Sequence, residues 1–383
     1  MTRMKTIKVG FMPLIDAAIP IAARECGFAE REGLQIDLVR ETSWANIRDK
    51  LIHDMFDASH MLAPLAVTTT LGIGNAKVPL AVPFGLNANG NCITLASQLY
   101  RALEEVLGHP PADPREAAQA LKRVIDKRKK SGAPPVTFGV VFPFSVHVII
   151  IRHWLRLGGI NPRREVLFQV VPPPFMVASL SEGIIEGCCV GEPWNSRAVE
   201  SGVGSIVVFG AEISRYAPDK VLALRDGVAA AENETVHRLL RAYKTAAHWC
   251  QDRENHRNLA QMLAQPEYLG VAPKTVLNAL TGTLAVNRTE TRAIPDFLLF
   301  EGEAINRPDP RKARWLYAEI MSGLGHRLDE AQAQAAASVF RPDIFDSATG
   351  NNQLPETGDP IALKYGPAFD ANDLAGYVKA IEQ

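Results

Sequence analysis

The alternation of short β-like segments with helical segments constrains the fold more than any other feature of this sequence. Residues 7–11, 34–39, 57–61 and 78–83 have the apolar patterns of strands, and helical patterns follow the first three. The joints between them are short and rich in Pro, Gly and Ser. This order predicts an α/β fold with mostly parallel sheets that helices cover.

The length of the chain predicts two lobes, because 383 residues exceed what one compact core usually holds. A polar turn at residues 87–91 marks the crossing into a second lobe, and a strand at 206–209 begins the return. Beyond residue 231 the patterns are largely helical. We therefore predict a two-lobed, periplasmic-binding-protein-like fold (type 2, Venus flytrap) that closes on its ligand by hinge motion. Its expected parts are lobe I (1–91 and 210–383), lobe II (92–209) and a ligand cleft between them.

Three consecutive prolines, Pro172, Pro173 and Pro174, end the strand predicted at residues 166–171. Each proline fixes φ and lacks a backbone donor, so this run cannot extend a central strand. We expect a rigid corner just beyond the carboxyl end of that strand. Small ligands bind at such ends in open α/β sheets.

Charge and composition narrow the possible partners. The formal net charge of −1 and the isoelectric point near 6.8 give no support for direct nucleic-acid binding or a polybasic membrane surface. The basic run KRKK at residues 127–130 ends a predicted helix, where cations are favourable. No apolar stretch has the length of a membrane span, and the N-terminal residues lack the pattern of a signal peptide. We therefore expect a cytoplasmic protein that does not contact a membrane.

The sequence lacks the familiar catalytic and metal-binding motifs. It has no G-x-S-x-G, H-E-x-x-H or P-loop pattern, and its histidines lack chelating spacing on one helix face. Its five cysteines, with no CxxC pair, indicate packing rather than a disulfide framework, and the adjacent Cys188 and Cys189 leave redox chemistry or soft-metal binding as the other interpretation. We expect a binding protein with no catalytic residue, metal or cofactor.

Three polar residues stand out as candidate anion ligands. His147 falls in the first turn of a helix that Ser145 should cap, where backbone N–H groups and a ring nitrogen can meet an anion. Trp44 follows Ser43 at another predicted helix start and could direct its indole donor at a ligand. Lys220, near the expected hinge, would need a counter-charge if buried. The alternatives are a surface histidine, a core tryptophan and an ordinary surface lysine.

Several phrases, in this order along the chain, resemble the nitrate-binding protein family, which comprises the solute-binding components of nitrate and bicarbonate importers. They are GFMPL at 10–14, SWANIRDK at 43–50, DASHMLAP at 57–64, NGNCIT at 89–94, FPFSVH at 142–147, VPPP at 171–174 and CVGEPWN at 189–195. The resemblance covers residues 5–225 best and implies the flytrap fold.

The resemblance also implies a ligand set. It assigns the anion to Trp44, Asn91, His147, Pro173 and Lys220, with Asn89, Gly90 and Glu192 as a second tier. Asn91 stands where many members have the longer Gln. Bicarbonate-binding members resemble this pattern but have an acidic residue at the lysine position and use calcium, so Lys220 implies nitrate, with nitrite as a related ligand. On this basis Lys220→Glu is expected to abolish nitrate binding and to leave the fold intact.

Without a leader, the sequence is most similar to the cytoplasmic nitrate/nitrite sensors of the NasS type. That similarity implies an ANTAR-domain RNA-binding antiterminator (NasT-type) as the partner, held inactive by the empty sensor and released by the anion to allow transcription of nitrate-assimilation genes. Three alternatives stay open. They are a transport binding protein whose leader was removed, the regulatory part of an importer's ATPase subunit, and an enzyme resembling the thiamin-pyrimidine synthases.

Overall fold

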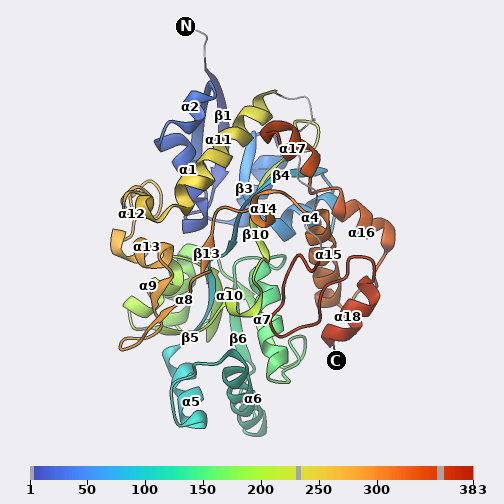
Figure 1. Ribbon diagram of the computed structural model, residues 1–383. Helices are drawn as coiled ribbons and strands as arrows, with labels where there is room; N and C mark the ends of the chain where they lie inside the picture. Colours follow the sequence, from blue (N-terminus) through green and yellow to red (C-terminus); the bar gives the residue numbers. More distant parts are fainter. Residues whose placement is uncertain (1–3, 230–233, 352–357, 383) are drawn as a thin grey trace.

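Two sheets, one above the other in Figure 1, organise the computed structural model of this protein, which describes residues 4–229, 234–351 and 358–382. The upper sheet has six strands in the order β13-β4-β10-β3-β1-β2, and the lower has five in the order β7-β6-β8-β5-β9. We keep the name lobe I for the first sheet with its helices and lobe II for the second. The strands are β1 (Lys5–Phe11), β2 (Leu34–Arg40), β3 (Ala58–Leu62), β4 (Leu80–Asn89), β5 (Asn91–Ala96), β6 (Val136–Val140), β7 (Val166–Val170), β8 (Gly187–Gly191), β9 (Gly204–Phe209), β10 (Pro218–Arg225) and β13 (Leu298–Leu299), with β11 (Thr283–Ala285) and β12 (Thr291–Ala293) forming a separate hairpin.

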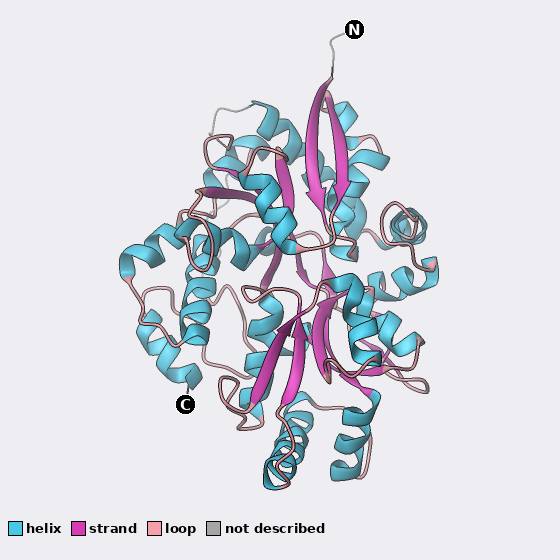
Figure 2. Ribbon diagram, turned by 180° about the vertical axis from the view of Figure 1, so that it is seen from behind, coloured by secondary structure: helices cyan, strands magenta, loops and turns pink. Residues whose placement is uncertain are grey.

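Helices cover both sheets, as Figure 2 shows from behind. Three short 3₁₀ helices, η1 (Ile15–Ala17), η2 (Pro173–Phe175) and η3 (Arg253–Asn255), accompany them. The α-helices are α1 (Ala18–Glu25), α2 (Phe28–Arg31), α3 (Trp44–Ile52), α4 (Ala63–Leu71), α5 (Ser97–Leu107), α6 (Pro114–Lys130), α7 (Val146–Leu157), α8 (Met176–Ser181), α9 (Trp194–Glu200), α10 (Gly210–Ile213), α11 (Glu234–Gln251), α12 (His256–Leu263), α13 (Pro273–Leu280), α14 (Glu303–Asn306), α15 (Pro310–Leu324), α16 (Glu330–Ala337), α17 (Pro342–Thr349) and α18 (Leu374–Glu382).

The sheets are mixed, which corrects the expectation of mostly parallel sheets. β1 pairs in parallel with β2 and β3, as the βαβα order predicts. However, β10 runs antiparallel to both β3 and β4, and β5 runs antiparallel to both β8 and β9. The physical reason is that the chain leaves lobe I through β4 and β5 and returns through β9 and β10. A strand that leads the chain back into a sheet enters it in the opposite direction.

Serine caps begin the two helices that matter most for the site. The Ser43 hydroxyl accepts from the Asn46 amide at the start of α3, and Ser145 accepts from the Val148 amide at the start of α7. Both caps were predicted from the sequence, and both are confirmed, because each satisfies a donor that a helix start leaves free. Asp16 lies within η1, and α1 begins at Ala18.

The crossing from lobe I to lobe II depends on two residues with positive φ, Asn89 at 65° and Gly90 at 84°. A side chain on Gly90 would collide with Leu298, so glycine is required at this turn. β5 begins at Asn91, one residue before the predicted start of lobe II.

The last third of the chain is largely helical, as predicted. α15 packs against α4 and α16, while α18 lies beside α15 (Figure 1). Residues 230–233, around the predicted start of this helical part, and residues 352–357 within it lie outside the described residues. Within the described part of the chain, every helix is too short or too polar to cross a membrane.

Candidate functional site

A cluster of buried polar side chains lies where the two lobes meet, and we call it the interlobe site. Its residues come from η1, the start of α3, β3, the start of β5, the first turn of α7 and β10. Each is at most 3% exposed: Asp16, Trp44, His60, Asn91, His147, Asp219 and Lys220. Polar groups so deeply buried need partners, so the contacts within the cluster show what it can hold.

Lys220 forms two ion pairs in this cluster. Its Nζ lies 2.8 Å from Asp16 Oδ2 and 2.7 Å from Asp219 Oδ2. Adjacent residues of a regular strand face opposite sides of the sheet, yet Asp219 reaches its own neighbour. The pairing of β10 with β4 shifts register on both sides of Lys220, and such irregularities redirect side chains. Burial alone would lower the pKa of Lys220, but the two carboxylates outweigh it and raise that pKa, so the lysine is charged.

His60 connects Asp16 to the backbone of lobe I. The Met12 amide donates to His60 Nδ1 over 3.3 Å, and Nε2 lies 2.9 Å from Asp16 Oδ1. Burial tends to raise the pKa of Asp16, but Lys220 and His60 outweigh it and lower that pKa to about 2. Asp16 is therefore a carboxylate throughout the physiological range.

Trp44 and His147 bring unpartnered polar atoms into the same cluster. Trp44 Nε1 and both ring nitrogens of His147 are buried and have no hydrogen-bond partner in the described structure. The Lys220 ammonium lies 5.7 Å from the centre of the Trp44 ring, and His147 Nε2 lies 3.9 Å from Asp219 Oδ2. Burial, the largest influence, lowers the pKa of His147 to about 4. Such unpartnered groups are costly and need an explanation, which a ligand would supply.

Asn91 faces the same carboxylate. Its Nδ2 donates to Asp219 Oδ2 over 3.4 Å, and the Cys189 thiol lies 3.9 Å from its Oδ1. A side chain at Gly210 would collide with this amide oxygen, so the glycine leaves room for Asn91. Four of the five residues that the resemblance names thus converge.

The other predicted residues lie at the edges of the cluster or elsewhere. Pro173 is buried at the start of η2. The contacts described above, which join the other four predicted ligands, do not involve Pro173. The Asn89 amide donates to the carbonyls of Arg215 and Asp296, which ties it to the crossing rather than to a ligand. Gly90 accepts from the Glu192 amide.

Glu192 helps to hold the lobes together. Its carbonyl accepts from the Ile15 amide, and the nearby Trp194 indole donates to the Pro13 carbonyl. Both bonds join residues 13–15 of lobe I to residues that directly follow β8 in lobe II, so the lobes are in contact around the site. Burial raises the pKa of the Glu192 carboxyl to about 7, with Ser196 and Asn195 opposing the shift.

Asp16, His60 and Asp219 are the site residues that sequence reasoning missed. Asp16 follows β1 and His60 lies in β3, and parallel strands bring their carboxyl ends to one edge of a sheet, where ligands bind. That rule could have identified both. Asp219 gave no such signal, because its orientation depends on the irregular register of β10.

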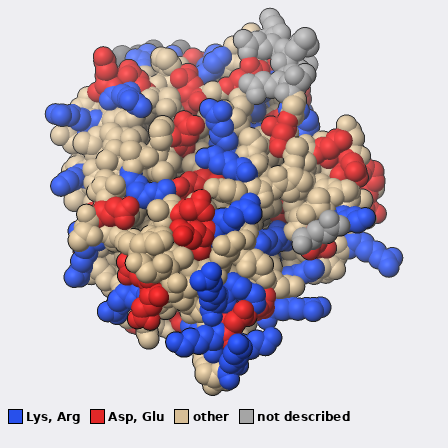
Figure 3. Space-filling view, turned by 60° about the horizontal axis from the view of Figure 1, so that its bottom comes forward, with Lys and Arg blue, Asp and Glu red and all other residues tan. Residues whose placement is uncertain are grey.

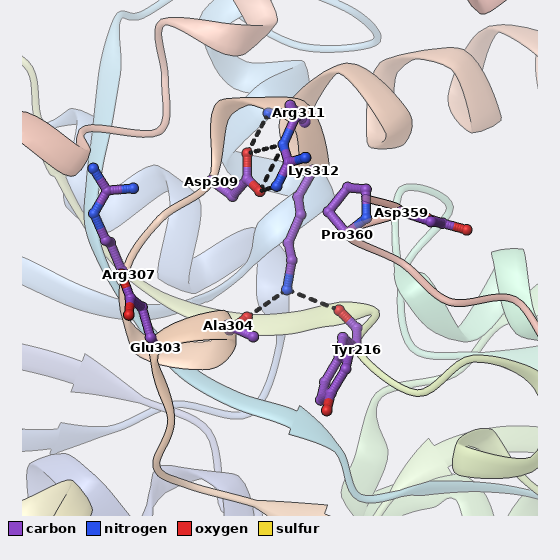
Figure 4. A pocket seen from close by; sticks show the side chains of 9 residues that line it. All are labelled: Tyr216, Glu303, Ala304, Arg307, Asp309, Arg311, Lys312, Asp359 and Pro360. Carbon is purple, nitrogen blue, oxygen red and sulfur yellow. Dashed lines mark hydrogen bonds and ion pairs between the residues drawn. The ribbon is translucent and has the colours of Figure 1, made fainter. Parts of the chain in front are cut away.

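A cavity of about 60 Å³ lies away from the interlobe site, beside Tyr216, α14 and the start of α15 (Figure 4). The basic side chains that line it already have partners within the protein. Arg311 pairs with Asp309, and Lys312 donates to the carbonyls of Tyr216 and Ala304 over 3.1 and 2.5 Å. The cavity therefore lacks the unpartnered donors that distinguish the interlobe site.

The face of the protein drawn in Figure 3 has no large patch of a single sign of charge. Basic and acidic side chains are interspersed there, with basic ones gathered toward the lower edge. The predicted basic helix end is confirmed, since residues 127–130 form the last turn of α6. Among the described residues, no three His, Cys, Asp or Glu side chains are placed to hold a metal ion. Cys188 and Cys189 are buried in β8, and burial raises the pKa of both thiols.

Comparison with known proteins finds relatives among nitrate transport components. Over 382 residues the chain is 30% identical to the nitrate import ATP-binding protein NrtC of Synechocystis, covering 97% of this chain and 54% of the relative. It is also 30% identical over 282 residues to the nitrate/nitrite binding protein NrtA of Nostoc, covering 72% of this chain and 61% of that one. The chain thus spans only about half to three fifths of these curated relatives.

The fold matches the crystal structure of the periplasmic nitrate-binding protein NrtA from Synechocystis. The TM-score is 0.88 at 24% identity, and the match covers 99% of this chain and 98% of the other. The predicted two-lobed periplasmic-binding-protein fold is confirmed. Residues 2–264 match the sequence model of the NMT1-like family. The resemblance to the nitrate-binding proteins is therefore confirmed, and the chain belongs to the NMT1-like family.

Proposed function

We propose that this chain binds nitrate, with nitrite as a related ligand, in the interlobe site. The observation that carries the proposal is the set of unpartnered nitrogens on Trp44 and His147, buried beside the charged Lys220. Nitrate is a small planar anion with three weak acceptor oxygens, so it needs several donors and a nearby positive charge. The starts of α3 and α7 add free backbone N–H groups and the positive ends of two helix dipoles.

The anion would act by holding the lobes together. Trp44 belongs to lobe I and His147 to lobe II, so a ligand that accepts from both favours the closed state. Because the site is buried, the ligand must enter through an open state, as hinge proteins allow. A ligand shifts such an equilibrium only by its difference in affinity for the two states.

The function that this switch would serve is cytoplasmic sensing of nitrate or nitrite, and the partner would be an ANTAR-domain antiterminator. Support comes from the resemblance to NasS-type sensors and from the near-neutral charge, which leaves RNA binding to the partner. The empty sensor would bind the partner and the closed sensor would release it. Coupling is reciprocal, so the partner must weaken anion affinity by the same factor by which the anion weakens partner binding.

A second candidate is the solute-binding part of a nitrate importer. The names of the relatives favour it, since NrtC is an import ATP-binding protein and NrtA a binding protein. Copurification with an untagged antiterminator, with and without nitrate, separates the two. The sensor predicts capture that nitrate reverses, whereas an importer component predicts no capture in either condition.

Trp44→Phe tests the site directly. It removes the indole donor, which has no hydrogen-bond partner among the described residues, together with part of a buried ring. We therefore expect a loss of stability from the cavity and a loss of nitrate affinity of about tenfold or more, measured by calorimetry. Trp154→Phe is the matched control, because Trp154 Nε1 donates to the Pro114 carbonyl over 2.9 Å away from the site. That variant should lose stability and keep its affinity.

Equal nitrate affinity in the wild type and in Trp44→Phe would contradict the assignment of the site. Lys220→Glu, which the sequence suggests as a test that spares the fold, is a poor choice. It would place a third buried carboxylate beside Asp16 and Asp219 and leave both without their cation. Loss of binding would then be inseparable from loss of the fold.

A further inference from the structure

The interlobe site has more negative than positive charge, which is unfavourable for binding an anion. One ammonium, on Lys220, faces two carboxylates, on Asp16 and Asp219, and all three groups are at most 3% exposed. With neutral histidines the cluster carries one net negative charge. A bound monoanion would add a second in a site closed to water, and uncompensated buried charge is strongly unfavourable. A compensating positive charge has to arrive together with the anion.

His60 cannot supply this charge. Its Nδ1 accepts from the Met12 amide, so the ring proton is on Nε2, which faces Asp16 Oδ1 at 2.9 Å. A second proton, on Nδ1, would face the Met12 N–H and break that hydrogen bond. Both ring nitrogens of His60 are thus already engaged within lobe I.

His147 has the opposite surroundings. Among the described residues neither ring nitrogen has a hydrogen-bond partner, and Nε2 lies 3.9 Å from Asp219 Oδ2. Without an anion, burial lowers its pKa to about 4, with Asp219 and Asp16 opposing and Lys220 adding to the shift, so the ring is neutral. With an anion on one side and Asp219 on the other, an imidazolium could donate from both nitrogens.

Three charged groups act on this histidine: Asp219 and Lys220 of β10 and Asp16 of η1. The other polar groups of the buried cluster are Trp44 of α3, His60 of β3, Asn91 of β5 and Cys189 of β8. The carboxyl of Glu192, just after β8, faces Ser196 and Asn195 instead. Glu192 also titrates in the physiological range, so an experiment must separate its proton from that of His147.

We propose that the interlobe site takes up one proton with each anion, and that His147 holds this proton between the anion and Asp219. The proton comes from the solvent, and no other bond forms or breaks. The inference rests on the proposed anion binding and adds its regulation. A lower pH strengthens binding, and the site selects ligands whose charge, together with that of the bound proton, sums to zero.

Calorimetry with sodium nitrate on the full chain, in buffers of different ionisation enthalpy, counts the protons. We expect about one proton per nitrate near pH 7, and about a tenfold loss of affinity per pH unit between about pH 6 and about pH 8. Nitrate binding with no proton uptake and a flat pH profile would overturn the inference and keep the proposed function. Absence of nitrate binding at every pH would overturn both.

Three variants assign the proton, with circular dichroism as the check on folding. His147→Gln should lose proton uptake and the pH slope. Asp219→Asn removes one negative charge, so its proton uptake should fall toward zero, and its affinity near pH 8 should exceed that of the wild type by about tenfold. Glu192→Gln should keep both proton uptake and the slope. Proton uptake that persists in His147→Gln and disappears in Glu192→Gln would show that Glu192 carries the proton, which overturns the assignment to His147.

Discussion

Two histidines of helix α7, His147 and His153, are both buried and both face a carboxylate, yet their surroundings differ. His153 Nε2 lies 2.8 Å from Glu319 Oε1, and the Tyr377 hydroxyl donates to the same oxygen over 2.5 Å. The Trp315 indole in turn donates to Tyr377 over 2.7 Å. His147 has a carboxylate 3.9 Å from Nε2, and neither of its ring nitrogens has a hydrogen-bond partner within the described part of the chain.

The comparison teaches that burial beside a carboxylate does not by itself mark a functional histidine. His153 has a close partner in Glu319, and this network ties α7 of lobe II to α15 and α18 (Figure 1). Burial opposes the charge on Glu319, but His153 outweighs it and the pKa of that carboxyl is lowered. The His153 network stabilises the protein, whereas the open contacts of His147 provide a place for a ligand. Each prediction below tests one side of this contrast.

Glu319→Ala should have the largest effect on stability. It removes the acceptor of His153 and Tyr377 in a buried network, and breaking a buried charged pair costs about 3–5 kcal/mol. Urea unfolding followed by circular dichroism measures the loss. Nitrate affinity, measured in the remaining folded protein, should stay near that of the wild type. A loss below about 1 kcal/mol would mean that the network contributes little to stability and would remove one side of the comparison.

Tyr377→Phe should have a smaller effect in the same direction. The hydroxyl donates to Glu319 and accepts from Trp315, and Glu319 keeps His153 as its partner. We expect a loss of about 1–2 kcal/mol in the free energy of unfolding, in line with one buried hydrogen bond and an unpaired indole. An effect as large as that of Glu319→Ala would show that Tyr377, rather than the ion pair, holds the network together.

The fold could be predicted further from the sequence than the site could. Alternating patterns and serine caps are local features, so most strands and the starts of α3 and α7 followed from the residues. The direction of β10 did not, because strand pairing depends on which segments meet after the chain crosses between lobes. Sequence reasoning named the cation of the site, Lys220, and missed its two carboxylates. A pair such as Asp16 and Lys220 exists only once η1 and β10 lie side by side.

His147→Leu should have the smallest effect on stability at neutral pH, less than about 1 kcal/mol, because the ring nitrogens lose no hydrogen bond. The pH dependence should still change. The pKa of His147 is lowered to about 4 in the folded protein from an ordinary value of 6.5, so its contribution is full above about pH 6.5 and is lost as pH falls toward 4. The leucine variant lacks that loss and should become relatively more stable over this range, as thermal unfolding at several pH values would show.

His153→Leu is the matched control and should lose stability already at neutral pH, because it breaks the pair with Glu319. If both variants lost stability equally at neutral pH, the two histidines would be alike, and the open contacts of His147 would no longer indicate a ligand site.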